Sequence, residues 1–478
     1  MKRSIIGTGM ILVLLGLLLT GCGDKEKETG IANKSSKAST EKSGEASDAV
    51  KRHIMKDLDQ VTESCLNTSN KANSYDYSLD ESFFLWFYSK YGQSLYRKLE
   101  QGLKKGEDAQ IYRRLTGQTL HTLWIYYCAD CGVHTEDLDH VYVMNSKNST
   151  DVVMDFAGDV NFDQSWPNIQ YMDEKKKSIK DCFSENLVKE MRDADLLMLN
   201  NEFTYGTGGT PLAGKTYTFQ AKPKRAEMLQ ELGVDIVSLA NNHAYDYGQE
   251  GLLETMKVLD DYKVPYVGAG KNLEEASKIS YFIINGKKIA ITSATQIERT
   301  LQFTKEATET TPGVLKTLHP KKYVKVIQEA REHADYVIVY VHWGTEGNSY
   351  FGGDQSALAR TFVDAGADVI IGNHTHCLQG IQYYKGVPIY YSLGNFWFDW
   401  NEPNAPATGL AQIVIHEDMT VDYSFLPCYY KNYKTSMLKS KKSIQKAYEH
   451  MNKISNGAKI DNDGHLINSE NSAHNYNN

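Results

Sequence analysis

The sequence predicts an α/β fold with largely parallel strands, preceded by a small helical module. From about residue 150 onward, short apolar runs rich in β-branched residues alternate with helical patterns. Several of these runs end in polar side chains; the run 367–371, for example, is followed closely by His374 and His376. Residues 51 to about 145 instead carry apolar and aromatic side chains near helical spacing. The change of period near residue 150 predicts the boundary between the two parts.

The bulk composition is that of an ordinary globular protein. A length of 478 residues is enough for two or three domains, and 41% hydrophobic and 23% charged residues are typical values. The net charge of −8 argues against a general nucleic-acid binder, because it provides no basic groove for a polyanion. We therefore expect no nucleic-acid partner.

The N-terminus carries the pattern of an export signal. Lys2 and Arg3 precede an apolar run, 5–19, which is rather short for a membrane span. The run ends in Leu-Thr-Gly-Cys, which resembles the bacterial lipobox and implies cleavage before Cys22 and lipid attachment to its sulfur. The alternative is an uncleaved anchor. Either way we expect the chain to be held at the extracytoplasmic face of the bacterial cell membrane. The lipobox pattern makes it a lipoprotein whose signal peptide spans 1–22.

Two segments follow the signal. Residues 23–50 contain no aromatic side chain and are rich in Lys, Glu, Ser, Ala and Gly, which predicts a flexible tether. Residues 51–148 are predicted to form two to four helices, whose aromatic stripe we interpret as core rather than as a ligand platform. Cys128 and Cys131 form a lone CxxC, for which a local disulfide or two free thiols is favoured over zinc or redox chemistry.

The α/β part is predicted over 149–430. The run 367–371 is expected to stop at Gly372, where the chain can turn without a Cβ penalty. The stretch containing Thr311-Pro312-Gly313 is expected to loop over one face, and 387–430 to form closing antiparallel strands. Residues 431–478 are predicted to be a helical or disordered tail, disordered from about residue 457. Strands are expected at 151–160, 196–203, 235–241, 264–270, 289–297 and 336–341, and helices at 183–195, 226–232, 250–259 and 355–365.

Polar residues of similar chemistry follow these strands. In open α/β sheets ligands bind beyond the carboxyl ends of the strands, so the loops are expected to converge on one crevice. Carboxylate, amide and imidazole groups together suit a pair of first-row divalent ions, with a carboxylate placed to bridge them. Taken singly, each residue is also explained as a cap, a loop hydrogen-bonder or a solvated histidine. The residues are Asp159, Asn161, Glu202, Asn242, His243, His342, His374 and His376.

These segments resemble the poly-γ-glutamate capsule synthesis protein family (CapA-type), which is similar to the calcineurin-like metallophosphoesterases. The resemblance covers roughly residues 150–427 and does not reach the helical module. It implies a four-layer α/β/β/α sandwich of the metallophosphoesterase type with two divalent metal ions (Mn, Fe or Zn). The motifs that carry it are AGDVNF, NNEF, SLANNHAYDYGQEGLLET, YVGAG, VHWGTE and DAGADVIIGNHTHCLQGIQYYKGVPIYYSLGNFWFD.

The resemblance also implies roles for single residues. Asp159 and His376 are expected to bind the first metal, and Glu202 to take the place of the bridging carboxylate. His243 matches the position that protonates the leaving group or holds the phosphoryl oxygen in the phosphoesterases, and Asp246 is close enough in sequence to orient it. Asn242, His342 and His374 are expected to bind the second metal.

Two departures from the phosphoesterase pattern put plain phosphoesterase activity in doubt. Asn161 stands where those enzymes have a histidine, which gives one metal a weaker ligand set. Glu202 replaces their bridging aspartate and is one methylene longer, which alters the metal spacing. Neither departure removes the predicted metal site.

Three further residues are candidates for substrate binding. Gly394 and Asn395 belong to the family's closing motif; Asn395 either touches substrate or fixes a tight turn in the wall of the site. Trp343 and Glu346 follow His342 and are expected to line the pocket.

Three functions remain open from the sequence. The first is a lipid-anchored, metal-dependent hydrolase or transferase of capsule biosynthesis, acting on an anionic polymer such as poly-γ-glutamate or a related envelope component. The second is a non-enzymatic accessory of a membrane synthase and export complex, with a structural or polymer-binding metal. The third is a generic extracellular phosphodiesterase or nucleotidase.

Overall fold

The computed structural model describes most of the chain from residue 77 to residue 469. The predicted signal peptide with Cys22, the tether 23–50, and Cys128 and Cys131 lie outside the described residues, as does the end of the predicted tail. The described residues are 77–105, 110–118, 123, 126–127, 140–144, 146–148, 150–298, 303–400, 403 and 405–469.

Two helices lie in the predicted helical module, in agreement with its apolar periodicity. They are α4 (Tyr77–Lys104), which is broken at Gly92, and α5 (Gln110–Thr116). Phe83 and Phe87 of α4 are fully buried and pack against Tyr112 of α5 at ring distances of 6.3 and 6.2 Å. Aromatic side chains therefore form the core of this helix pair.

The α/β part contains two mixed sheets. In the first sheet the central pairs β10–β12, β12–β13 and β13–β15 are parallel, as is the edge pair β1–β9, while the pairs β9–β10 and β14–β15 are antiparallel. The order across this sheet is β1 (Val141–Met144), β9 (Ser280–Ile284), β10 (Lys287–Thr295), β12 (Tyr336–His342), β13 (Val369–Asn373), β15 (Val387–Leu393) and β14 (Leu378–Tyr384).

In the second sheet the parallel strands β2, β3, β6 and β7 continue into an antiparallel meander at one side. Its order is β19 (Lys434–Met437), β18 (Val421–Lys431), β17 (Ala407–Ile415), β2 (Val152–Val160), β3 (Leu196–Asn201), β6 (Ile236–Ser238) and β7 (Tyr266–Val267), with β16 (Asn395–Trp397) paired to β2. The two sheets confirm the predicted α/β class.

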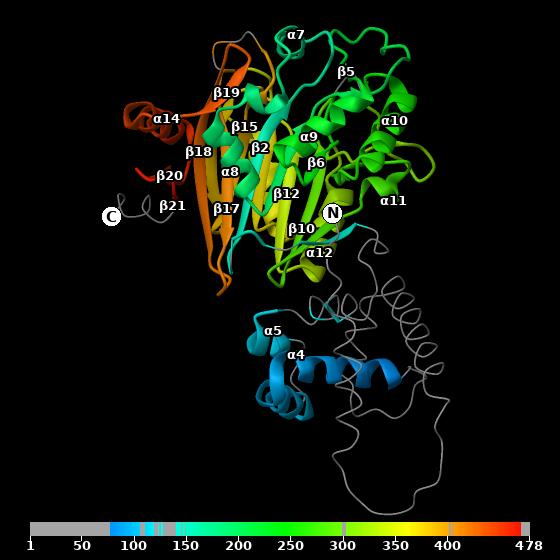
Figure 1. Ribbon diagram of the computed structural model, residues 1–478, viewed down its shortest axis with the longest axis vertical. Coiled ribbons are helices and arrows are strands. Elements are labelled where there is room, and N and C mark those ends of the chain that lie inside the picture. Colours follow the sequence, from blue (N-terminus) through cyan, green and yellow to red (C-terminus); the bar gives the residue numbers. More distant parts are fainter. Residues whose placement is uncertain are drawn as a thin grey trace, which may run out of the picture. The chain divides into compact units, whose positions relative to one another are not determined.

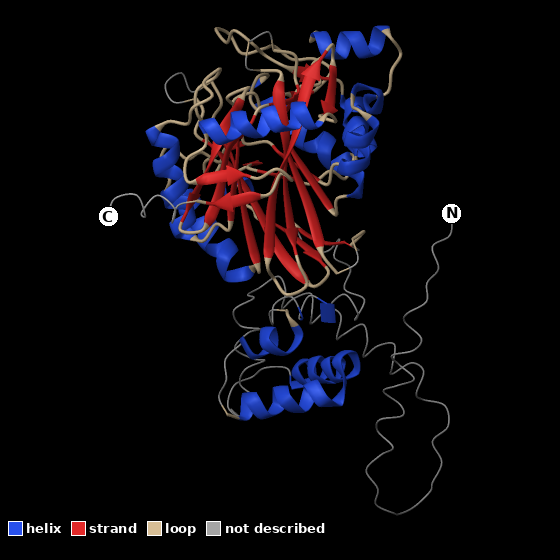
Figure 2. Cartoon of the chain, turned by 90° about the vertical axis from the view of Figure 1, so that its left-hand side faces the viewer, coloured by secondary structure: helices blue, strands red, loops and turns tan. Residues whose placement is uncertain are grey.

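The sheets pack face to face through a shared apolar core. Val152, Met154 and Phe156 of β2 alternate into this core, where they meet side chains of the first sheet such as Ile338 and Ile371. Two further apolar clusters lie on the outer faces of the sheets and join them to helices. The four layers are therefore helix, sheet, sheet, helix, which is the sandwich that the family resemblance implies (Figure 2).

Amphipathic helices supply the outer layers. On the first sheet, Tyr323, Val326, Ile327 and Ala330 recur at helical spacing and bury one face of α12. In Figure 1, α8 and α9 lie in front of the sheet that contains β2 and β6. The helices of the α/β part are α7 (Pro167–Glu174), α8 (Glu185–Asp193), α9 (Glu227–Leu232), α10 (Gly248–Asp261), α11 (Leu273–Ala276), α12 (Lys321–His333), α13 (Gly353–Ala365) and α14 (Lys441–Ile454).

The structure corrects three expectations about elements. Part of the stretch expected to loop between β10 and β12 is the helix α12. The expectation of disorder from about residue 457 is wrong up to residue 469, because β20 (Ala458–Ile460) and β21 (Leu466–Asn468) form a hairpin. The segment 387–393 is not purely antiparallel, since β15 also pairs parallel with β13.

The expected turn at Gly372 is also wrong, because β13 continues to Asn373. The positive φ angles fall instead at His374 (95°) and His376 (53°). Gly372 has another role: a Cβ there would lie 2.1 Å from the Tyr391 carbonyl oxygen and 2.4 Å from Trp343 Nε1. Glycine is therefore required by close packing, not by a turn.

No helix among the described residues is both long enough and apolar enough to cross a membrane.

Candidate metal centre

The predicted ligands meet beyond the carboxyl ends of five strands. Asp159 lies at the end of β2, Glu202 follows β3, and His342 is the last residue of β12. His374 follows β13, and Asn242 lies in the loop after β6. Parallel strands that end at the same edge bring residues far apart in sequence into one place. All of these side chains are buried, as is that of His376.

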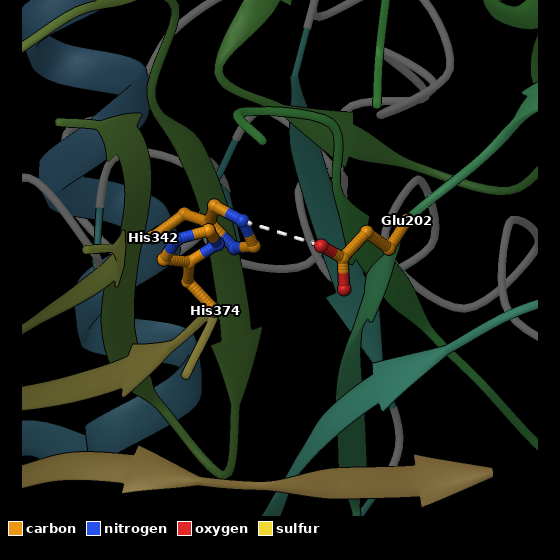
Figure 3. Close-up of side chains that lie close together, drawn as sticks. All are labelled: Glu202, His342 and His374. Carbon is orange, nitrogen blue, oxygen red and sulfur yellow. Dashed lines mark ion pairs between the residues drawn. The ribbon is translucent and has the colours of Figure 1, made fainter. Parts of the chain in front are cut away.

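Glu202 stands at the centre of two overlapping groups of ligand atoms. In each group the candidate atoms lie within 4.8 Å of one another. The first group is Glu202, His342 and His374 (Figure 3), in which His342 Nε2 lies 3.4 Å from Glu202 Oε1. The second is Asp159, Glu202 and His376, in which His376 Nε2 lies 3.9 Å from the same oxygen. His342 and His374 were expected at one metal and Asp159 and His376 at the other, and Glu202 belongs to both groups.

Asn242 joins the first group through its side chain. Its Oδ1 lies 2.7 Å from His342 Nε2. His342 Nε2 thus lies close to two oxygens, the Asn242 amide oxygen at 2.7 Å and the Glu202 carboxylate oxygen Oε1 at 3.4 Å.

Two asparagine side chains contact the candidate ligands and orient them. Asn200 Nδ2 donates to Asp159 Oδ1 at 2.8 Å and lies 3.3 Å from His342 Nδ1. Asn395 Oδ1 lies 2.8 Å from His376 Nδ1, so this nitrogen carries the proton and Nε2 keeps its lone pair toward the centre. This contact orients a predicted ligand, a role that the sequence analysis did not assign to Asn395.

His243 and Asp246 form a pair beside the centre. Asp246 Oδ2 accepts from His243 Nδ1 at 2.7 Å and from the Phe219 main-chain N–H at 2.7 Å. Burial lowers the pKa of His243, while the Asp246 carboxylate acts in the opposite direction. The ring is held in one tautomer, with Nε2 left for a partner, as the predicted orienting role of Asp246 requires.

Burial dominates the electrostatics of the ligands. It raises the pKa of both carboxyls, Asp159 and Glu202, and for Glu202 the neighbouring Asp159 charge raises it further. Burial also lowers the pKa of His342 well below its usual value and that of His376 to about 4. Two acids and two histidines are therefore all held toward their neutral forms.

This environment fits a divalent cation. Neither carboxylate oxygen of the buried Glu202 has a hydrogen-bond partner within the described part of the chain. An ionised carboxylate left without a donor in a protein interior is strongly unfavourable, whereas a cation would compensate it. Neutral imidazoles and carboxylates are also the donor set that Mn, Fe and Zn accept.

Three predicted site residues have other roles or positions. Asn161 Oδ1, the atom expected to bind metal, accepts from the Asp163 main-chain N–H at 2.8 Å. Trp343 was expected to line the pocket, and this is wrong: its ring is fully buried on the outer side of the first sheet, stacked on Tyr391 and donating to the Tyr391 carbonyl. Glu346 is exposed, and its charge raises the pKa of Asp159 and Glu202.

The sequence reasoning missed residues that touch the centre. Trp400 stacks on His376 with ring centroids 4.6 Å apart, and Lys215 donates to Asp246 Oδ1. The segment 209–216 does match the spacing G-x-x-x-x-G-K-T of a phosphate-binding loop. That match is misleading, because the segment lies between the short strands β4 (Thr204–Tyr205) and β5 (Gln220–Ala221) and opens no helix.

Part of the chain matches a known protein family. Residues 153–400 match the family described as bacterial capsule synthesis protein PGA_cap. The chain is 36% identical over 216 residues to the PGA biosynthesis protein CapA of Bacillus subtilis (strain 168), covering 45% of this chain and 56% of that protein. It is 36% identical over 225 residues to the capsule biosynthesis protein CapA of Bacillus anthracis, covering 45% of this chain and 52% of that protein.

The chain thus spans about half the length of the curated relatives it matches. Among solved structures, it is similar to the NAD nucleotidase (NadN) of Haemophilus influenzae at 13% identity and a TM-score of 0.29. That match covers 70% of this chain and 66% of the nucleotidase.

Proposed function

The chain belongs to the bacterial capsule synthesis protein family PGA_cap, and from this premise we propose that it is a metal-dependent hydrolase or transferase of capsule biosynthesis. The proposed substrate is an anionic polymer such as poly-γ-glutamate or a related envelope component. One observation carries the proposal: two groups of buried ligand atoms overlap at Glu202, whose oxygens have no donor among the described residues.

In this proposal one cation is held by Glu202, Asn242, His342 and His374, and the other by Asp159, Glu202 and His376. Two such ions would supply Lewis-acid charge that polarises the scissile group and activates water. Asn200 and Asn395 keep the carboxylate and imidazole ligands oriented through the contacts described above.

His243 is the proposed general acid. Its Nδ1 is fixed by Asp246, so a proton on Nε2 is the one that can reach a leaving group. Because its Nδ1–H is donated to Asp246, Nε2 carries a proton only in the imidazolium form, which the Asp246 charge favours; burial disfavours that form, so the imidazolium would give up its Nε2 proton readily and return to the neutral ring. The proton then passes from Nε2 to the departing atom, while Asp246 holds the ring orientation.

We further propose that the chain is anchored at the extracytoplasmic face of the membrane by a lipid on Cys22. The N-terminal sequence alone supports this proposal. Metabolic labelling with a fatty acid analogue tests it: label should follow the wild-type chain into the membrane fraction and be absent from Cys22→Ala. Labelling of that variant to the wild-type level would contradict the anchor.

The enzymatic proposal is tested by metal analysis together with a panel of γ-glutamyl and phosphoester substrates. We expect bound divalent metal, turnover of at least one substrate, and loss of turnover in His243→Ala with metal retained. The matched control is His450→Ala, because His450 is an exposed histidine on α14. Bound metal without turnover, and capsule formation that survives His243→Ala, would contradict it.

The accessory role remains the second candidate. It is favoured by the Asn161 side chain, whose oxygen is occupied by a main-chain N–H and which replaces a histidine of the phosphoesterases. In that role the metal would bind polymer carboxylates or stabilise the fold, within a synthase and export complex. Ready hydrolysis of a chromogenic phosphodiester, lost in His376→Ala, would instead support the third candidate, an extracellular phosphodiesterase.

A further inference from the structure

Lys215 is a buried cation beside the candidate centre that the proposed chemistry does not use. It lies in the connection 206–219 between β4 and β5, and only 7% of its side chain is exposed. Its ammonium group donates to the Asn242 main-chain oxygen and to Asp246 Oδ1. A third acidic partner, Glu298 Oε1, lies 3.7 Å away.

These contacts are directed at the loop that carries Asn242 and His243. Lys215 reaches Asn242 through its main chain and reaches His243 through the Asp246 carboxylate, which in turn holds the imidazole. The two loops are also joined by the Leu212 N–H, which donates to the Asp246 carbonyl at 2.9 Å. The Lys215 ammonium group therefore contacts both the main chain of the candidate ligand Asn242 and the carboxylate that orients the candidate acid His243.

The same contacts argue against a direct role in binding an anionic substrate. An ammonium group has three donors. Two of the Lys215 donors are used by Asn242 and Asp246, and the third faces Glu298. The Lys215 charge nevertheless acts on the centre, because it lowers the pKa of Glu202 and of His342.

We propose that Lys215 is a positioning residue that fixes the 241–247 loop, and with it Asn242 and His243, at the candidate centre. The inference rests on the proposed function for its catalytic consequence, but the loop contacts are made by the Asn242 main-chain oxygen and Asp246 Oδ1, which are not predicted metal-binding atoms. Charge-assisted hydrogen bonds from a buried ammonium are stronger than those from a neutral donor, so they hold both acceptors firmly.

The first test measures amide hydrogen exchange of residues 239–247 in the full, metal-free chain. In Lys215→Ala we expect exchange about 10- to 100-fold faster than in wild type, since hydrogen bonds to charged groups are lost. Lys222→Ala is the matched control, because Lys222 is an exposed lysine just after β5. Exchange in β10 and β12 should remain as in wild type. Unchanged exchange of 239–247 in Lys215→Ala would overturn the proposal.

The second test asks whether the charge itself is needed. Ethylammonium should restore protection to Lys215→Ala, because it brings a cation of suitable size into the vacated space, whereas propanol should not. Equal rescue by both would overturn the proposal. If Lys215→Ala does not fold, Lys215→Met keeps most of the side-chain volume and is expected to show the same faster exchange.

The third test measures kcat and KM of Lys215→Ala and wild type, with Mn²⁺ and a substrate that the wild type turns over. We expect kcat of Lys215→Ala to fall about 10- to 100-fold with KM nearly unchanged, as for residues that orient ligands from behind. A rise in KM with kcat unchanged would overturn the positioning role in favour of substrate binding. Faster loop exchange in the variant together with a wild type that binds no metal would support the loop role and refute the proposed function.

Discussion

Asp155 provides a direct test of the electrostatic reasoning applied to the candidate centre. It lies on β2, four residues before Asp159, and is fully buried. Gln412 Nε2 donates to its Oδ1 at 3.1 Å, and Oδ2 has no hydrogen-bond partner among the described residues. Burial raises the pKa of Asp155 from its ordinary value of 3.8 to about 8. The residue is therefore expected to be protonated in the folded protein at neutral pH.

The pKa of Asp155 sets the sign and size of its contribution to the pH dependence of stability. Between pH 4 and pH 8 the folded protein holds a proton on Asp155 that the unfolded chain has released, so stability is present below pH 4 and is lost as pH rises toward 8. At about 1.4 kcal/mol per pKa unit, a shift of about four units sets an upper limit of about 6 kcal/mol. Asn in place of Asp keeps the carbonyl acceptor for Gln412 and removes this loss.

Urea unfolding at pH 5 and pH 8 measures the effect. Asp155→Asn should be more stable than wild type, and the difference should be larger at pH 8 by several kcal/mol. Asp463→Asn is the control, because Asp463 is exposed in the β20–β21 turn. If the free energies of unfolding of the variant and the wild type differed by the same amount at pH 5 and pH 8, Asp155 would be ionised in the folded protein. The argument that buried carboxyls at the centre need a cation would then fail as well.

Three other predictions concern the centre and its walls. Glu202→Gln should lower bound metal, measured by mass spectrometry, more than His376→Ala does, because Glu202 belongs to both ligand groups; equal losses would contradict a shared role. Asn395→Ala should weaken Mn²⁺ binding in calorimetry about 10- to 100-fold, since it frees the His376 ring, and an unchanged affinity would refute the orienting role. Gly372→Ala should cost at least about 1–3 kcal/mol in urea unfolding, because its Cβ would lie 2.1 Å from a carbonyl oxygen. Gly353→Ala, with open space around its Cβ, should cost nothing, and equal effects of the two substitutions would refute the packing argument.

The sequence was informative where one physical rule placed many residues at once. Apolar runs mark buried strands, and parallel strands release their loops at one edge, so Asp159, Glu202 and His342 were predicted to meet without knowledge of the strand order. The helix α12 was not predicted because the stretch between β10 and β12 contains Thr311-Pro312-Gly313, and proline and glycine favour a turn. Disorder was wrongly expected near residue 460 because composition does not show that β20 and β21 pair.

Side-chain direction was the part that sequence did not reveal. Trp343 directly follows His342, but successive strand residues point to opposite faces, so one enters the centre and the other the outer core. Asn200 belongs to the NNEF motif, which did not assign it a role, and the phosphate-loop spacing around Lys215 indicates a different chemistry from the contacts that Lys215 makes. Contacts of this kind depend on how loops pack, which local pattern does not encode.

The central claim is that buried side chains from distant strands hold two cations around Glu202. A crystal structure of the full chain soaked in Mn²⁺, with anomalous scattering recorded, tests it most directly. We predict two anomalous peaks, one contacting Glu202, His342 and His374 and the other contacting Asp159, Glu202 and His376. Absence of any peak there, with saturating Mn²⁺ present, would contradict the claim.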